Sequence, residues 1–337
     1  MTHARIGDGK LDIDLPLPEG ITALHGPAGA GKTALLEAIA GFTRPARGRI
    51  LIGDAIVFDA ESGVNLAPRE RRCSWVGAHE ALFPHLTVRQ NLLFAAARWA
   101  RLERTKRAAE ILEHFELADA LEMSPRDLPA ARRLRVEVAR ALITEPRALL
   151  VDHRETDEAL LRLAREAFSG PVLWVIDNLD ICYAAATRLA LIENGRIVGY
   201  GAARDVIERP ESVEAARLVG LDNLYSATVA ALDPGRNSCR LECGDFVLSA
   251  PYLKGRLNGD RVSVGIRPAD VPVHAAEIEE DVNFIAVHLL RVLEHPRMVR
   301  LEFAGGITAE ISREVYARQK DNKSWRVEFP PAALRIF

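Results

Sequence analysis

The sequence predicts an α/β domain built on a parallel sheet, followed by a small all-β domain. In the first part, short apolar runs such as "GITALHG", "RALLVD" and "GPVLWVID" alternate with stretches of helical period, as in a parallel sheet covered by helices. From Leu224 onward the apolar runs are short, alternate with polar residues and are broken by glycine and proline. A chain of 337 residues that is 48% hydrophobic is long enough for two domains, which we place at residues 1–221 and 222–337.

The first element that carries chemistry is a glycine-rich loop between the strand "GITALH" and the helix "TALLEAIA". Its spacing, Gly26-x4-Gly31-Lys32-Thr33, is typical of a phosphate-binding loop, and the flanking strand and helix disfavour a glycine-rich turn without a ligand. Glycines let backbone N–H groups face a phosphate, while Lys32 supplies a positive charge and Thr33 a hydroxyl for Mg²⁺. The expected nucleotide-binding residues are Gly26, Pro27, Ala28, Gly29, Ala30, Gly31, Lys32, Thr33 and Ala34.

A helical insertion is expected at about residues 84–128. This stretch is apolar at helical spacing and rich in arginine and glutamate. Because sheet-forming runs lie on both sides of it, we predict a helical subdomain inserted into the α/β domain.

The apolar run "RALLVD" ends in Asp152, at the tip of a predicted buried strand. An acid in that place is suited to order a magnesium ion together with the hydroxyl of Thr33. The two residues are therefore the expected Mg²⁺ ligands. The residue that follows, His153, occupies a place where a nucleotide hydrolase often carries a water-activating glutamate.

The C-terminal β domain contains an internal repeat. When Pro268 is laid on Pro331, a strand of period two runs into Pro-Ala in both copies, which predicts a duplicated barrel half. The matched positions are Val262, Val264, Ile266, Ala269 and Val271 in the first copy, and Trp325, Val327, Phe329, Ala332 and Leu334 in the second.

Composition excludes several classes of protein. The formal net charge is -3 and the basic residues are scattered, so no nucleic-acid partner is expected. No segment approaches the roughly 18 uncharged apolar residues of a membrane helix, and no leader pattern is present, so we expect a cytoplasmic protein that reaches the membrane through partners. Cys239 and Cys243 lie in an alternating stretch, so they are expected to pack on one face of a sheet rather than bind metal.

Together these residues resemble the ATP-binding subunits of ABC transporters, most closely those of molybdate and related oxyanion importers. The resemblance covers nearly the whole chain. It rests on "GITALHGPAGAGKTALLEAIAGFTRPARGRI", "LAPRERRCSWVGAHEALFPHLTVRQNLLF", "ARALITEPRALLVD" and "VGIRPADV".

The resemblance implies a P-loop NTPase domain of the ABC ATPase type, with an inserted helical subdomain and an oligobinding-like C-terminal domain of the TOBE or Mop type. It implies ATP and Mg²⁺ as cofactors, and membrane permease subunits and a second ATP-binding subunit, identical or different, as partners. It also implies a position on the inner face of the cell membrane. The C-terminal domain of such proteins is regulatory or binds an oxyanion.

The chain departs from the family pattern around the γ-phosphate. The glutamine before the helical subdomain is Ala78, and the catalytic glutamate is His153. The switch histidine is Asp177, in "VLWVIDNLD". The Ser-Gly-Gly of the signature is replaced by Pro129, Ala130 and Ala131.

These departures predict binding of Mg-ATP with slow or absent hydrolysis. Proline at 129 removes an N–H group, and alanines restrict the close approach that glycines permit. His153 is a poor substitute for a water-activating carboxylate, and Asp177 places a negative charge near the γ-phosphate. Two other functions stay open: a non-catalytic, nucleotide-responsive regulatory or structural partner of a transporter, and an active ATPase that couples hydrolysis to import.

Two further points concern histidines and the adenine ring. No aromatic residue precedes Phe42, so adenine lacks a stacking partner unless His3 serves, and a disordered terminal histidine is the alternative. His85, in "FPHL", matches a family residue expected at the permease interface. His79, His85 and His153 are expected to be solvated or interface residues rather than a metal site.

Overall fold

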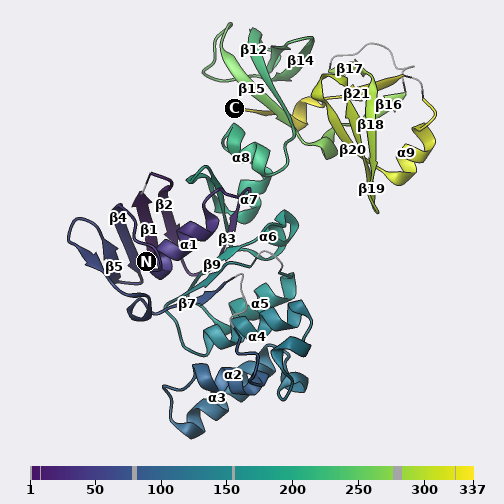
Figure 1. Ribbon diagram of the computed structural model, residues 1–337. Coiled ribbons are helices and arrows are strands. Elements are labelled where there is room, and N and C mark those ends of the chain that lie inside the picture. The colour runs from purple at the N-terminus through teal and green to yellow at the C-terminus, as the bar shows by residue number, and fades with distance from the viewer. Residues whose placement is uncertain (1, 8, 78–81, 154–155, 276–282, 323) are drawn as a thin grey trace. The chain divides into compact units, whose positions relative to one another are not determined.

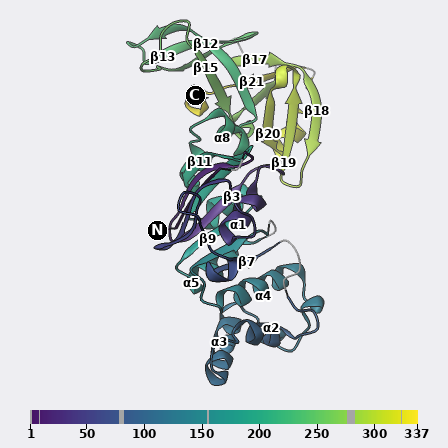
Figure 2. The ribbon, with the colours of Figure 1, turned by 60° about the vertical axis from the view of Figure 1, so that its left-hand side comes forward.

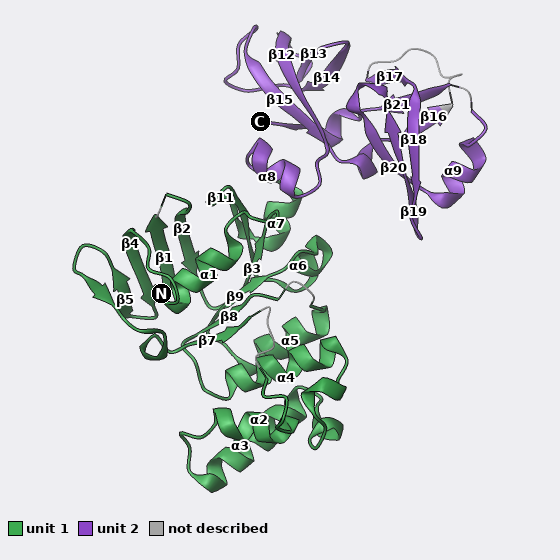
Figure 3. Ribbon diagram, viewed as in Figure 1, with its two compact units in different colours: residues 1–209 green, residues 210–337 purple. Residues whose placement is uncertain are grey.

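The computed structural model describes residues 2–7, 9–77, 82–153, 156–275, 283–322 and 324–337. It divides into two compact units, residues 1–209 and 210–337, which Figure 3 shows in two colours. Each unit has its own hydrophobic core. The division falls before α8 (Val213–Leu218), whereas the sequence places the boundary after residue 221.

One mixed sheet organises the first unit. Its strands are β1 (Thr2–Gly7), β2 (Asp12–Leu17), β3 (Gly20–His25), β4 (Arg47–Ile52), β5 (Ala55–Asp59), β6 (Val64–Asn65), β7 (Cys73–Val76), β8 (Ala148–Val151), β9 (Pro171–Val175), β10 (Arg188–Glu193) and β11 (Arg196–Ala202). Among the described residues they lie in the order β6-β5-β4-β1-β2-β11-β10-β3-β9-β8-β7. Neighbours from β10 to β7 are parallel, and β2, β1, β4, β5 and β6 form an antiparallel wing.

The helices of this unit are α1 (Lys32–Ala40), α2 (Val88–Ala95), α3 (Arg101–His114), α4 (Ala130–Leu142), α5 (Glu158–Ala167), α6 (Leu179–Ala185) and α7 (Ala203–Glu208). Helix α1 lies against the sheet (Figures 1 and 2). Its residues Leu35, Leu36 and Ile39 are fully buried in the core of the first unit. No helix in the described ranges has both the length and the apolarity of a membrane span.

The C-terminal end of α1 is held by a buried arginine. Arg71 donates to the carbonyl oxygens of Ala38 at 2.7 Å, Ile39 at 2.9 Å and Leu66 at 2.9 Å. Burial lowers the pKa of Arg71, but its guanidinium stays charged at any physiological pH. Gly41 ends the helix at φ 90°, and a β-carbon there would lie 2.5 Å from the Arg71 Nε. The arginine thus replaces water as the donor to the last carbonyl groups of the helix.

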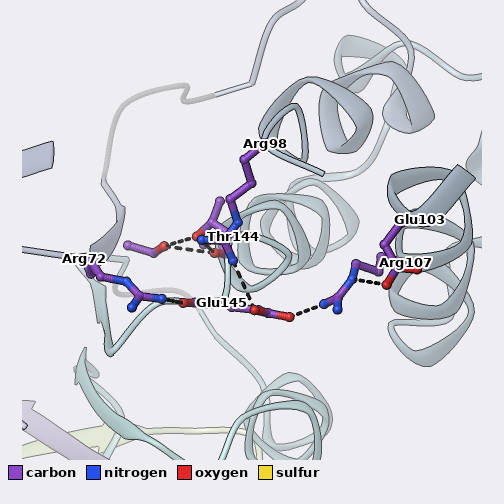
Figure 4. A network of polar contacts seen from close by, with 8 residues as sticks. Arg72, Arg98, Glu103, Arg107, Thr144 and Glu145 are labelled. Carbon is purple, nitrogen blue, oxygen red and sulfur yellow. Dashed lines mark hydrogen bonds and ion pairs between the residues drawn. The ribbon is translucent and has the colours of Figure 1, made fainter. Parts of the chain in front are cut away.

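The helical insertion is fastened to the rest of the unit through Glu145, which follows α4 (Figure 4). Its carboxylate accepts from Arg98 at 3.1 Å and from Arg107 of α3, and its carbonyl accepts from Arg72 at 3.4 Å. The guanidinium groups of Arg107 and Arg98 also lie 3.9 and 4.6 Å from the centre of the Trp99 ring. Two arginines of the insertion and one arginine that precedes it therefore meet at one residue.

The second unit is all β apart from short helices. Its elements are α8, α9 (Arg313–Gln319), β12 (Asn223–Asp233), β13 (Ser238–Cys243), β14 (Phe246–Pro251), β15 (Arg261–Ile266), β16 (Val273–Ala275), β17 (Phe284–Val287), β18 (Leu289–Glu294), β19 (Met298–Phe303), β20 (Thr308–Ser312), β21 (Trp325–Glu328) and β22 (Arg335–Ile336). In the described part of the chain they form sheets in the orders β14-β13-β12-β15-β22, β16-β21-β17 and β18-β19-β20. The predicted architecture, an α/β domain with a parallel sheet followed by an all-β domain, is confirmed, and the sheet of the first domain also carries an antiparallel wing.

The internal repeat is confirmed, and its two copies exchange strands. Strands β15 and β21 each run into a 3-10 helix, at Pro268–Asp270 and Pro331–Ala333, and a further strand follows each. The strand after the first copy, β16, pairs with β21, whereas the strand after the second copy, β22, pairs with β15. Each copy of the repeat, with the strands around it, forms one half of the domain. Strand β22 of the second half thus pairs in the sheet of the first half, and β16 of the first half pairs in a sheet of the second.

Two buried asparagines make equivalent contacts between the halves. The Asn223 amide accepts from the Thr308 N–H at 2.7 Å and donates to the Thr308 carbonyl at 2.8 Å. The Asn283 amide makes the same pair of bonds with Ser249, at 2.6 and 2.8 Å. Asn223 belongs to the first half and reaches β20 of the second, and Asn283 belongs to the second half and reaches β14 of the first. Each amide side chain therefore bonds to both the N–H and the carbonyl group of one residue, as the main chain of a neighbouring strand does.

Candidate functional site

The glycine-rich loop lies where the sequence predicts it, between β3 and α1. Its tip, Pro27 to Gly29, is exposed, and Gly29 and Gly31 have φ angles of 78° and 105°. A β-carbon at Gly26 would lie 2.0 Å from the Ile192 carbonyl oxygen, and one at Gly31 would lie 2.6 Å from the Leu11 side chain. Only glycine fits at these two positions, so the loop has the close-packed curl that leaves backbone N–H groups open to a phosphate.

The loop rests on the turn between β10 and β11. The Gly195 N–H donates to the Ala30 carbonyl at 2.9 Å, and the Asp12 N–H donates to the Gly195 carbonyl at 2.8 Å. Within the loop, the Ala30 N–H donates to the Pro27 carbonyl at 3.2 Å. Sequence reasoning missed this support, although the "ENGR" turn after a predicted strand marks the place where Asn194 and Gly195 adopt positive φ.

The Lys32 side chain is buried and turned toward the loop itself. Its ammonium donates to the carbonyl oxygens of Gly26 and, at 3.0 Å, of Pro27. It also lies 3.8 Å from a carboxylate oxygen of Asp177, whose side chain is 44% exposed. The lysine is therefore positioned at the centre of the cradle and already has an acidic neighbour.

Thr33 and Asp152 are brought together as the sequence predicts. The Thr33 hydroxyl donates to the Asp152 carboxylate at 2.7 Å. Asp152 is buried at the end of β8, where its N–H donates to the Val76 carbonyl at 2.7 Å. A hydroxyl and a carboxylate are ligands that suit Mg²⁺, which usually takes one or two protein oxygens and completes its shell with water and phosphate. The residues therefore fit a magnesium ion carried by a nucleotide.

The residue after Asp152 lines a cavity at the beginning of α4. The His153 carbonyl accepts from the buried Trp174 indole at 3.3 Å, and its half-buried side chain lines a cavity of about 150 Å³. The other lining residues are Ala130, Ala131, Leu134, Thr156, Asp157 and Leu160. The histidine thus shares a cavity with two signature positions of its own chain.

The signature positions form the beginning of α4. Pro129 precedes the helix at φ -55°, and no side chain caps this end. Ala130 and Ala131 are exposed, so their methyl groups cover the place where a glycine would leave the backbone bare. Asp157 caps the next helix, α5, because its carboxylate accepts from the Leu160 N–H at 2.6 Å. Ala78 lies outside the described residues.

The loop "FPHLTVRQN" is organised by Asn91, whose role the sequence did not reveal. The buried Asn91 amide donates to the carbonyl oxygens of Phe83 at 3.1 Å and Thr87 at 3.0 Å, and it accepts from the Phe83 N–H at 2.8 Å. Gln90 forms a capping box with Thr87 at the start of α2. His85 is exposed, and its ring centre lies 6.0 Å from that of Phe83.

The other sequence candidates belong to other elements. His3 is ordered in β1, opposite Pro16 and Leu51, and bonds to Asp14 at 2.5 Å. It is at the far end of the strand from Leu11, which contacts the loop. Cys239 and Cys243 are buried on one face of β13, as predicted, and the described residues contain no cluster of metal-ligating side chains. Burial raises the pKa of the Cys243 thiol to about 11.

The chain matches known proteins along most of its length. Residues 11–154 match the model of the ABC transporter family. The molybdenum import ATP-binding protein ModC of Rhodospirillum rubrum is 33% identical over 302 residues, which cover 87% of this chain and 76% of that protein. The molybdate/tungstate import ATP-binding protein WtpC of Pyrococcus horikoshii is 32% identical over 259 residues, covering 74% of this chain and 70% of that protein.

Solved structures of ABC cassettes share the fold of the first unit. A nucleotide-free ATP-binding cassette from an ABC transporter superposes with a TM-score of 0.53 at 21% identity, covering 64% of this chain and 97% of that one. The ATP-binding subunit of another ABC transporter superposes with a TM-score of 0.51 at 21% identity, covering 62% of this chain and 91% of that one. With these relatives and this fold, the chain belongs to the family of ABC transporter ATP-binding proteins that includes the molybdenum import ATP-binding proteins.

Proposed function

We propose that this chain is the ATP-binding subunit of an ABC importer for molybdate or a related oxyanion such as tungstate, and that it binds Mg-ATP but hydrolyses it slowly or not at all. The relatives at 31–33% identity are named for import of molybdenum, molybdate or tungstate, which supports the transported solute. The observation that carries nucleotide binding is the joining of Thr33 and Asp152 beside the glycine-rich loop.

Binding would use the loop from Gly26 to Thr33 together with Ala34 at the start of α1. Backbone N–H groups of the loop would hold the phosphates, and Lys32 would neutralise their charge. Thr33 and Asp152 would hold Mg²⁺, which supplies positive charge to the β- and γ-phosphate oxygens. These roles require Lys32 to turn from the carbonyl groups of Gly26 and Pro27 toward the ligand.

Impaired hydrolysis is supported by the surroundings of His153. A positioned general base contributes roughly 10²–10⁴-fold to such a step. The His153 carbonyl accepts from Trp174, and the His153 side chain lines a cavity with Ala130 and Ala131, two of the altered signature positions. Pro129 also removes an N–H group at the start of α4, where a partner subunit's nucleotide would be gripped.

Docking to a permease is supported by an aromatic cluster next to the helical insertion. Phe94 of α2 is 61% exposed and contacts Phe83 edge to face with ring centres 4.8 Å apart, and the exposed His85 lies beside Phe83. Exposed aromatic side chains held by a rigid loop are typical of protein interfaces. We place the chain on the inner face of the cell membrane through this contact, with an identical or different cassette as its second partner.

The test measures nucleotide binding by calorimetry and phosphate release for the wild-type chain, for His153→Glu and for the matched control His153→Gln. We expect wild-type protein to bind Mg-ATP and to release phosphate slowly. His153→Glu should recover little activity, because Pro129, Ala130 and Ala131 still differ from the signature. Phosphate release by wild-type protein at the rate of intact family members would overturn the proposal of impaired hydrolysis.

A second candidate function, a nucleotide-responsive regulatory partner of a transporter, is favoured by the same combination of an intact phosphate loop and altered positions around it. The interlocked β domain would then serve as the regulatory part, with an oxyanion as its ligand. Binding of molybdate measured by calorimetry, with and without ADP, distinguishes a domain that responds to the oxyanion from one that only stabilises the chain.

A further inference from the structure

The P-loop lysine has an acidic partner supplied by the chain itself. The Lys32 ammonium lies 3.8 Å from a carboxylate oxygen of Asp177. A phosphate-loop lysine contacts the β- and γ-phosphates of a bound nucleotide. A carboxylate of the protein therefore lies near the ammonium group that the terminal phosphate of a nucleotide would approach.

The position of Asp177 follows from the order of the strands. Strand β9 lies between β3, which leads into the glycine-rich loop, and β8, which ends at Asp152. Beyond β9, the Ile176 N–H donates to the Leu24 carbonyl at 3.2 Å, and the Ile176 carbonyl bonds to the His25 imidazole at 3.0 Å. These two bonds fix the main chain next to Asp177 against the start of the loop.

The other acid of the site, Asp152, does not change the contact between Lys32 and Asp177. Asp152 accepts the Thr33 hydroxyl at 2.7 Å, so its carboxylate belongs to the predicted Mg²⁺ position. Asp177 is the acid on the lysine side, 3.8 Å from the Lys32 ammonium. A bound Mg²⁺ would offset part of the phosphate charge near Thr33 but would leave Asp177 facing whatever phosphate reaches Lys32.

We propose that Asp177 discriminates against the γ-phosphate, so that the site holds a nucleoside diphosphate at least as tightly as a triphosphate. A triphosphate brings an additional, highly charged group toward Lys32 and Asp177, whereas a diphosphate ends one phosphate earlier. Like charges within a few ångströms oppose each other, and each phosphate must also compete with Asp177 for the lysine. This inference rests on the proposed nucleotide binding and adds a selectivity to it.

The experiment compares Mg-ADP and Mg-ATP affinities by calorimetry for wild type, Asp177→Asn and the matched control Asp180→Asn. Asp180 is an exposed acid three residues further on, so its replacement removes the same charge without touching Lys32. We expect Asp177→Asn to tighten Mg-ATP binding about five-fold and Mg-ADP binding by less than about two-fold, as for a half-exposed charge pair. Asp180→Asn should leave the ratio of the two affinities unchanged.

The dependence of the two nucleotide affinities on ionic strength provides a second measurement. A purely structural role of Asp177 would not make their ratio depend on salt. Raising the ionic strength should weaken the discrimination against Mg-ATP in wild type and have little effect on the ratio in Asp177→Asn. If both nucleotides bind and Asp177→Asn leaves their ratio unchanged, this inference is wrong and the proposed binding stands. If neither nucleotide binds to wild type or to Asp177→Asn, the proposed binding is wrong and this inference falls with it.

Discussion

At the scale of single residues, the ends of three adjacent strands determine the chemistry of the candidate site. The glycine-rich loop follows β3, Asp177 follows β9 and Asp152 follows β8. Thr33 and Lys32 each already contact one of these acids, at 2.7 and 3.8 Å. A nucleotide with its metal would therefore enter a site whose polar groups already contact one another, and its affinity is the difference between the new contacts and those it replaces.

The Thr33 hydroxyl offers a direct test of the metal position. Thr33→Val keeps the shape of the side chain but removes the oxygen, so we expect the gain in nucleotide affinity on adding Mg²⁺ to fall about ten-fold, the usual size for one lost ligand contact. Thr33→Ser keeps the hydroxyl and should retain the gain. Calorimetry with Mg²⁺ and with EDTA measures the effect, and an equal gain in all three proteins would contradict the assigned ligand.

The sequence located Lys32, Thr33, Asp152 and Asp177 and predicted that Thr33 and Asp152 act together, but it did not show the contact between Lys32 and Asp177. The types and the spacing of these residues are local properties of the sequence, and they indicate a phosphate loop and an acid that orders a metal ion. The contact between Lys32 and Asp177 depends on β9 lying beside β3, which is a property of the sheet order. For the same reason the support of the loop by Gly195 was not predicted, because it comes from a turn far along the chain.

At the scale of elements, the phosphate loop depends on helix α1, which is secured at both ends. Its first turn begins in the loop, and Arg71 satisfies the carbonyl groups of Ala38 and Ile39 at the other end. Buried carbonyl groups without a donor are costly, so one arginine outside the helix stabilises its last turn. Positioning of Lys32 and Thr33 is thereby coupled to a residue distant in sequence.

We expect Arg71→Ala to destabilise the first unit by about 3–5 kcal/mol, because it leaves buried carbonyl groups unpaired and opens a cavity. Arg71→Lys should also destabilise the unit, since an ammonium lacks the planar fork that reaches several carbonyl groups at once. The control Arg69→Ala changes an exposed arginine two residues earlier and should leave the unit nearly unchanged. Denaturant unfolding followed by tryptophan fluorescence measures the three variants, and equal stability of Arg71→Ala and Arg69→Ala would contradict the assigned role.

Most elements of the fold were predictable because their patterns are local. The apolar runs of β3, β8 and β9 and the alternation in β15 and β21 marked strands, and helical spacing marked the insertion. Pairing between distant strands was not predictable, since β22 has only two residues and no pattern that selects one neighbour. The repeat at Pro268 and Pro331 was visible in the sequence, whereas the exchange of β16 and β22 depends on how the domain closes.

At the scale of the whole molecule, each of the two units has its own core, and the second is interlocked by its repeat. Asn223 and Asn283 make equivalent bonds from one half to the other. Because each half also contributes a strand to the other, neither half has a complete set of strand neighbours alone. The second unit should therefore unfold in a single transition.

Replacement of either asparagine tests this coupling. Asn223→Ala and Asn283→Ala each leave a buried N–H and carbonyl unpaired, so we expect each to lower the stability of the second unit by about 2–4 kcal/mol. Thermal unfolding should still show one transition for this unit, shifted to lower temperature. The control Glu242→Ala removes an exposed side chain of β13 and should shift it little. Two separate transitions in either asparagine variant would show that the halves are independent.

The exchange of β16 and β22 also determines when the β domain can fold during translation. Strand β15 receives its outer neighbour only when Arg335 and Ile336 have emerged from the ribosome, although the rest of its half was synthesised much earlier. Chains grow at about 5–20 residues per second, so this half waits for seconds with an open edge while the first unit already has all its strands. A ribosome that stops before Arg335 would thus release a folded cassette joined to an unfinished β domain, which proteases can recognise.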